Sequence, residues 1–254
     1  MIDTFYVSIP KLSNIERKAY VYLPTTYDED DDRRYPVIYM FDGHNLFSDD
    51  EATFGRSWRL ADYLDYTDTQ VIIAAVECNH EGDERLSEYS PVDFSFNGKT
   101  IKGKGKKYMD WLVNEFKPYI DKTYKTIKNR ENTAIAGHSM GGLMSLYAFS
   151  KYNRVFSKAA AISPSVWIKY GEELDFIKNI KVSKDSILYT SYGELEFKNH
   201  EGMRECFSKA TERLMNNGVN VTSRIVKGGK HNEETCEKEI PFFMQTLGFV
   251  SENG

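Results

Sequence analysis

Short runs rich in apolar and β-branched residues recur along the chain and predict buried strands. They lie at residues 37–41, 71–76, 133–136, 159–162, 187–190 and 221–226. Most of these runs lack an alternating polar face, which is typical of strands covered on both sides of a parallel sheet. Two further β-rich segments, 5–9 and 18–23, open the chain and predict an antiparallel hairpin at the sheet edge.

Amphipathic patterns with helical spacing separate most of the predicted strands. They cover residues 58–66, 108–124, 142–152, 203–216 and 234–247. Alternation of short strands with helices indicates an α/β fold whose mostly parallel central sheet carries helices on both faces. No linker rich in Pro, Gly or Ser divides the sequence, so we expect one domain over residues 1–254.

Composition limits the classes of protein to which this chain can belong. The 254 residues are 41% hydrophobic, enough for a sizeable core without disulfides or metal ions. A net charge of −5 argues against a nucleic-acid-binding protein, which needs a basic surface. The basic stretch 99–107 is expected to be a solvated connection.

Cysteine usage and hydropathy suggest a location. Cys78, Cys206 and Cys236 are widely spaced and include no CxxC pair, so neither a disulfide framework nor a zinc motif is expected. The sequence has no run of about eighteen apolar residues and no leader-like start, so we expect no membrane partner and a cytoplasmic location.

The strongest chemical signal is the segment GHSMGG at residues 137–142, between a predicted strand and a predicted helix. In a nucleophile elbow, a serine occupies a tight strand-to-helix turn in which glycines avoid collisions with neighbouring backbone. Ser139 is therefore the expected nucleophile. It would lie at the start of a helix, where free N–H groups stabilise a developing oxyanion.

A serine nucleophile needs a base and an acid, which should follow it in the chain order serine, acid, histidine. His231 is the expected base because it follows a predicted strand, and His200 is the alternative. The loop after the strand 187–190 offers two carboxylates, Glu196 as first choice and Glu194 as the alternative.

An oxyanion hole needs two backbone N–H donors. Met140 follows the nucleophile, and His44 lies in the turn after the strand 37–41, so these residues are the expected donors. His138 flanks the nucleophile and is expected to pack beside the elbow.

These motifs together resemble the esterase D-like family of α/β-hydrolases, which includes feruloyl and acetyl esterases, enterochelin-type siderophore esterases and S-formylglutathione hydrolases. Besides GHSMGG, the resemblance rests on YVYLP (20–24), YPVIYMFDGHNLF (35–47), RLSEYSP (85–91) and AISPSVW (161–167). The family's usual DGQNLF appears here as DGHNLF, which puts His44 in the pocket, and a proline common after the elbow helix is Asn153.

The resemblance implies an α/β-hydrolase fold and the triad Ser139, Glu196 and His231, with the glutamate in the G-x-x-E turn at 193–196. The residues that it leads us to expect around the substrate are Asn45, Arg85, Tyr89, Trp167 and His138. It implies neither a cofactor nor a metal ion. A homo-oligomer is compatible with it, because such esterases are commonly dimers.

The expected function is a serine esterase that acts on a small-molecule carboxylic ester, such as an acylated sugar, a hydroxycinnamoyl ester or a short-chain acyl ester. The alternatives are a siderophore-lactone esterase and a thioesterase such as S-formylglutathione hydrolase, although the latter branch uses an aspartate. Outside enzymes, the alternatives are a catalytically silent binding module and, more weakly, a metal-binding protein using His231 and Cys236.

Overall fold

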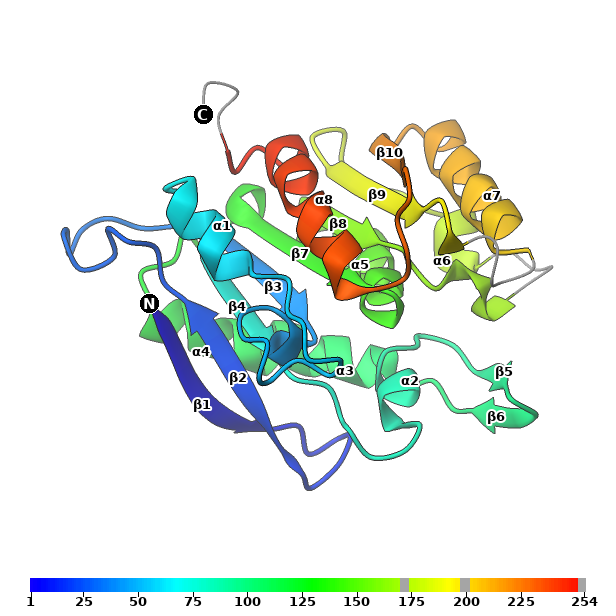
Figure 1. The fold of residues 1–254 in the computed structure, drawn as a ribbon, viewed down its shortest axis with the longest axis horizontal. Helices are drawn as coiled ribbons and strands as arrows, with labels where there is room; N and C mark the ends of the chain where they lie inside the picture. The colour runs from blue at the N-terminus through cyan, green and yellow to red at the C-terminus, as the bar shows by residue number, and fades with distance from the viewer. Residues whose placement is uncertain (170–173, 197–201, 251–254) are drawn as a thin grey trace.

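The chain folds around an eight-stranded sheet, seen in the computed structural model of Figure 1. The structure describes residues 1–169, 174–196 and 202–250. The strands of the sheet are β1 (Ile2–Ser8), β2 (Glu16–Tyr22), β3 (Val37–Phe41), β4 (Ile72–Val76), β7 (Thr133–His138), β8 (Lys158–Ile162), β9 (Ile187–Gly193) and β10 (Asn220–Val226). A separate hairpin is formed by β5 (Phe94–Phe96) and β6 (Lys99–Ile101).

The strand order is β1-β2-β4-β3-β7-β8-β9-β10. The β1–β2 hairpin is antiparallel, β2 is antiparallel to β4, and every other neighbouring pair in this sheet is parallel. The predicted mostly parallel sheet with an antiparallel N-terminal hairpin at its edge is therefore confirmed.

Helices connect the strands and cover both faces of the sheet (Figure 1). They are α1 (Leu60–Tyr66), α2 (Glu84–Glu88), α3 (Gly105–Trp111), α4 (Lys117–Thr123), α5 (Met140–Lys151), α6 (Asp175–Lys178), α7 (Met203–Asn216) and α8 (Glu233–Thr246). Short 3-10 turns lie at η1 (Gly43–Asn45), η3 (Arg130–Asn132) and η4 (Val166–Lys169), and the π-helical η2 (Leu112–Phe116) joins α3 to α4.

Alternation of side chains along the strands divides the core between the two faces. Tyr39 of β3 belongs to the core cluster that also contains residues of α3, α4, α5, α6 and α7, whereas the next residue, Met40, belongs to the cluster that contains residues of α1 and α8. Both faces of the central strands are buried, which explains why their sequences are continuously apolar.

Two segments differ from the sequence-based expectation. Residues 99–101 form β6, paired with β5, and Ile101 is buried, so the basic stretch 99–107 is not simply a solvated connection. The predicted helix 108–124 begins at Gly105 and contains a π-helical segment. The β5–β6 hairpin turns at Asn97 and Gly98, which both have positive φ, and an Asn-Gly pair between strands is a local hairpin signal that the sequence-based interpretation missed. In the part of the chain that the structure describes, no helix combines the length and apolar character needed to cross a bilayer.

Candidate active site

Ser139 lies in a strained turn between β7 and α5. Its φ of 60° and ψ of −120° are unfavourable for a residue with a Cβ. The turn is held by the Ser139 N–H, which donates to the Ile162 carbonyl (3.0 Å), and by the Ser139 carbonyl, which accepts from Leu143 N and Ser165 N (3.0 Å each). A Cβ at Gly137 would lie 2.6 Å from the Gly141 backbone, so the turn requires glycine there.

A chain of hydrogen bonds links Ser139, His231 and Glu196. The Ser139 Oγ lies 2.9 Å from His231 Nε2, and His231 Nδ1 lies 2.7 Å from Glu196 Oε2. Glu196 is buried, whereas about a third of the His231 side chain is exposed (33%). The three residues follow β7, β9 and β10, whose carboxyl ends meet at one edge of the sheet, where open α/β sheets bind ligands.

The second oxygen of Glu196 is also held. Glu196 Oε1 accepts hydrogen bonds from the Ser163 hydroxyl (2.6 Å) and from the Gly193 N–H (2.8 Å). Glu194 points elsewhere, since its Oε2 accepts from Gly228 N (2.8 Å). Of the two carboxylates that the sequence offered, the structure brings Glu196 to the histidine.

The two expected oxyanion donors follow neighbouring parallel strands. Met140 is the first residue of α5, after β7, and His44 lies in η1, after β3. Both residues are therefore at the carboxyl edge beside Ser139. The imidazole of His44 contacts other groups, because its Nε2 lies 3.0 Å from the Thr53 hydroxyl.

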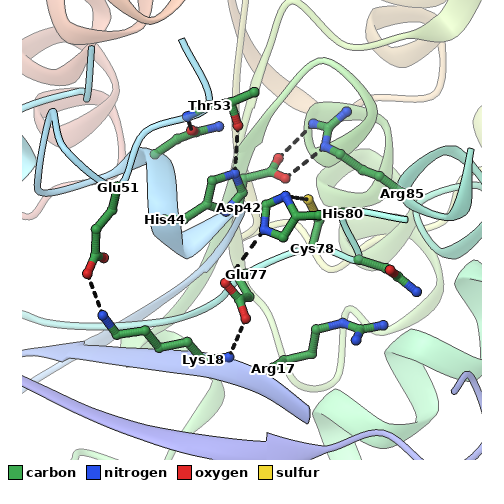
Figure 2. Close-up of polar contacts among 12 residues, drawn as sticks. Arg17, Lys18, Asp42, His44, Glu51, Thr53, Glu77, Cys78, His80 and Arg85 are labelled. Atoms are coloured by element: carbon green, nitrogen blue, oxygen red, sulfur yellow. Dashed lines mark hydrogen bonds and ion pairs between the residues drawn. The ribbon is translucent and has the colours of Figure 1, made fainter. Parts of the chain in front are cut away.

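Asp42, in the turn after β3, and Arg85, in α2, form an ion pair at this edge (Figure 2). Arg85 Nε donates to Asp42 Oδ1 (2.8 Å), and its NH2 donates to Oδ2 (2.7 Å). Burial alone would raise the pKa of Asp42, but the charge and hydrogen bonds of Arg85 hold that pKa below its usual value. The pair fixes the turn that carries His44.

A pocket of about 290 Å³ opens at Ser139 and His231. Three of the residues expected around the substrate, Asn45, Arg85 and His138, line it. Its walls also include Phe41, Asp42, Leu46, Thr53, Phe54, Trp58 and Glu233. Burial raises the pKa of Glu233, while burial and the neighbouring His231 lower the pKa of His138 well below its usual value.

The other two residues expected at the substrate lie elsewhere. Tyr89 is fully buried, and its hydroxyl accepts from the Asp42 N–H (3.3 Å), so it stands behind the pocket wall. Trp167 packs beside Phe94 and Phe96 and lines a separate hollow. Sequence motifs place these residues on loops near the site but do not say which way each side chain points.

Two further alternatives from the sequence are a metal site that uses His231 and Cys236, and His200 as the base. Cys236 lies on the buried side of α8, where burial raises the pKa of its thiol well above the usual value. His231 faces Ser139 and Glu196. These positions do not favour a shared metal site. His200, the alternative base, lies outside the described residues.

Several residues of the site escaped the sequence reasoning. Ser163, which holds Glu196, directly follows β8, and its position at a strand end was the available signal. Phe54 lines the pocket although 80% of it is exposed, and Glu233 enters it from the first turn of α8. No local pattern distinguishes these two from ordinary surface residues.

Comparison with known proteins identifies the family of this chain. A family model described as "Putative esterase" matches residues 11–232. An uncharacterized protein of Bacillus subtilis, YbbA, is 25% identical over 201 residues, 78% of this chain and 76% of the relative. The siderophore triacetylfusarinine C esterase of Aspergillus fumigatus is 27% identical over 172 residues, 63% of this chain and 56% of the relative.

Among solved structures, a ferulic acid esterase superimposes with a TM-score of 0.70 at 18% identity. The match covers 98% of this chain and 97% of that structure. At this identity the likeness concerns the fold, which is the mostly parallel α/β arrangement described above.

Proposed function

We propose that this chain, which belongs to the "Putative esterase" family and is a carboxylic ester hydrolase, works through Ser139 as its nucleophile. The observation that carries the proposal is the hydrogen-bonded chain from Ser139 through His231 to Glu196. A serine, an imidazole and a carboxylate in this order form the arrangement that activates a hydroxyl for acyl transfer. We infer that one domain, 1–254, carries this activity.

In the first half of the reaction, His231 Nε2 takes the proton of Ser139 as its Oγ attacks the ester carbonyl. The backbone N–H groups of Met140 and His44 stabilise the negative charge on the carbonyl oxygen. His231 then donates that proton to the leaving alcohol, and the acyl group remains on Ser139.

In the second half, His231 removes a proton from a water molecule, which attacks the acyl-enzyme. The tetrahedral intermediate collapses, releases the carboxylic acid and returns the proton to Ser139. Glu196 holds the imidazole in the required orientation and stabilises its charged form. The bonds to Ser163 and Gly193 keep Glu196 in place during both halves.

The pocket favours a compact, uncharged ester. Asp42 and Glu233 line it, and its lining cation, Arg85, is already paired with Asp42. Among the lining residues that the structure describes, a negatively charged substrate group would therefore meet carboxyl groups without a free cation to balance it. Phe54 and Trp58 offer aromatic surface for an aryl or short acyl group.

A siderophore ester is the second candidate. The observation that favours it is the relative from Aspergillus fumigatus, a siderophore esterase that is 27% identical over 172 residues. This candidate fits the same catalytic chemistry and differs in the alcohol and acyl groups that the pocket must accept.

The nucleophile is tested by the variant Ser139→Ala with p-nitrophenyl acetate as substrate. We expect kcat/KM to fall by about 10⁴- to 10⁶-fold with an unchanged circular dichroism spectrum. Retention of activity in the folded variant would contradict the serine mechanism.

The acid is tested by a matched pair of variants. Glu196→Gln should lower kcat by about 10³- to 10⁴-fold because the histidine loses its charged partner. Glu194→Gln, two residues away, should keep the wild-type kcat because Glu194 contacts a backbone N–H and not the histidine. A large loss of kcat in Glu194→Gln with wild-type kcat in Glu196→Gln would identify Glu194 as the acid.

The substrate class is tested with a panel of methyl ferulate, acetylated xylo-oligosaccharides, triacetylfusarinine C, and dimethyl succinate against monomethyl succinate. We expect the neutral succinate diester to be hydrolysed faster than the anionic monoester. A faster anionic ester would contradict the charge argument, and the best substrate in the panel decides between the two candidates.

The contribution of the aromatic surface of Phe54 to substrate binding is tested with Phe54→Ala. If an aryl group packs on Phe54, kcat/KM for methyl ferulate should fall by about 5-fold relative to methyl butyrate. The control is Tyr66→Ala, another exposed aromatic residue, at the end of α1 and outside the pocket lining. Equal effects of the two variants on both substrates would exclude a role for Phe54 in recognition.

A further inference from the structure

Three side chains with metal-binding atoms meet beside the active site: His44, Cys78 and His80 (Figure 2). One ligand atom from each lies within 4.8 Å of those of the other two. His44 follows β3, and the other two follow β4, its parallel neighbour in the sheet. The ester hydrolysis described above uses neither Cys78 nor His80.

Both histidines have their outer nitrogen engaged. His44 Nε2 lies 3.0 Å from the Thr53 hydroxyl, and His80 Nε2 lies 3.5 Å from Glu77 Oε2 (Figure 2). Metal-binding histidines usually have such a partner on the nitrogen that faces away from the ion. The Nδ1 atoms of His44 and His80 are therefore the nitrogens left for a ligand.

The inner atoms are close to one another, and one of them lacks a hydrogen-bond partner in the described part of the chain. His80 Nδ1 lies 4.0 Å from Cys78 Sγ. Among the described residues, His44 Nδ1 is buried and has no hydrogen-bond partner. An unpaired buried polar atom is costly, and a bound ion would supply the missing partner.

The ligand types and spacing suit zinc. Thiolate and imidazole are its preferred ligands, with Zn–S near 2.3 Å and Zn–N near 2.0–2.1 Å. Tetrahedral geometry at those bond lengths places ligand atoms about 3.3–3.6 Å apart. The separations here are 4.0 Å between Cys78 and His80 and at most 4.8 Å among the three residues, so binding would draw the side chains together. His80 is largely exposed and is free to make this movement.

We propose that His44 Nδ1, Cys78 Sγ and His80 Nδ1 bind one Zn²⁺ ion, with a water molecule in the fourth position. The Cys78 thiol releases its proton to solvent when the ion binds, because the thiolate is the ligand. Glu77 Oε2 lies 3.5 Å from the outer nitrogen of His80, and its negative charge favours the ring orientation in which that nitrogen carries the proton. The site does not depend on the esterase function, although it would join the loop after β4 to the one that carries His44.

The site is tested by titrating Zn²⁺, and Co²⁺ as its coloured substitute, into the full chain after treatment with a chelator. Calorimetry should give one ion per chain. The Co²⁺ form should show a thiolate-to-cobalt charge-transfer band. Absence of binding, or binding without that band, would overturn the proposal.

Graded variants separate this site from adventitious binding. Cys78→Ser should abolish the charge-transfer band, and the exposed His80→Ala should weaken Zn²⁺ more than about 100-fold, beyond the 10–100-fold typical of an outer partner. Glu77→Gln should weaken it by about 10-fold. The control Cys206→Ser changes a cysteine outside the cluster and should bind as wild type.

Esterase turnover without added metal shows whether a variant is folded. His80→Ala should keep the wild-type kcat because His80 takes no part in ester hydrolysis. Two further results would overturn the proposal. One is Zn²⁺ affinity unchanged in both Cys78→Ser and His80→Ala. The other is affinity lost in His231→Ala but not in those variants, which would place the ion at the triad.

Discussion

Neighbouring ionisable residues at the pocket have shifted pKa values with different causes. Asp42 is kept ionised by Arg85, although burial opposes its charge. Within the described part of the chain, His138 has no such counter-charge: burial and the nearby His231, whose ring centroid lies 4.3 Å away, lower its pKa well below the usual value. His138 is therefore neutral at neutral pH and unfavourable to protonate in the folded state.

This difference predicts how stability depends on pH. In the unfolded chain His138 binds a proton below about pH 6.5, whereas the folded state binds it only at lower pH. The unfolded state thus binds more protons between these values, and stability falls as pH drops below about 6.5. We expect His138→Gln to reduce the difference in unfolding free energy between pH 7.5 and pH 5, measured by urea denaturation. An unchanged difference would show that other groups account for the acid sensitivity.

At the scale of elements, the parallel strands position the residues of the site. The loops after β3, β7, β8, β9 and β10 supply His44, Ser139, Ser163, Glu196 and His231, so groups far apart in the sequence converge at one edge. The turn from β7 to α5 must pass close to the end of β8. Gly142 in α5 makes this approach, because a Cβ there would lie 2.7 Å from the Ile162 carbonyl oxygen.

We predict that Gly142→Ala displaces the elbow. The added methyl meets backbone that cannot move without shifting β8, so unfolding free energy should fall by about 1–3 kcal/mol, and kcat should fall as well. The control is Gly218→Ala, where φ is +73° but nothing lies within 4 Å. The backbone strain in Gly218→Ala should lower the unfolding free energy by about 1–2 kcal/mol and leave kcat unchanged. Equal kcat in both variants would mean that the elbow tolerates the displacement.

At the scale of the molecule, a buried ion pair connects the N-terminal hairpin to α2, the helix that carries Arg85. Arg17 of β2 and Glu88 of α2 are each about 1% exposed, and their side chains lie 3.4 Å apart. Glu88 also accepts from the Asn79 N–H (2.6 Å). The sheet edge and the pocket wall are therefore joined through residues that are 71 positions apart.

Breaking this pair should lower the stability of the fold. Glu88→Gln leaves the Arg17 charge buried without a counter-charge, so we expect a loss of about 3–5 kcal/mol in unfolding free energy by urea denaturation. Replacing both residues together, as Arg17→Met with Glu88→Leu, should cost less than the single change because no unpaired charge remains. A double variant less stable than Glu88→Gln would show that the pair contributes net stability.

Local sequence predicted the parts that depend on neighbouring residues in the chain. The apolar runs indicated the strands of the central sheet, because burial on both faces leaves a signature in each segment by itself. The turn at Ser139 was equally local, since glycines are required where the backbone closes on itself. Strand ends then pointed to His231 and to two glutamates as its partners.

Only the tertiary structure decided what depends on register and side-chain direction. Glu194 and Glu196 follow the same strand, and three-dimensional placement alone brings Glu196 to within 2.7 Å of His231. Tyr89 and Trp167 belong to recognisable motifs, yet neither lines the pocket at Ser139. The cluster of His44, Cys78 and His80 exists because β4 pairs beside β3, and that pairing is a contact between distant segments that no single segment specifies.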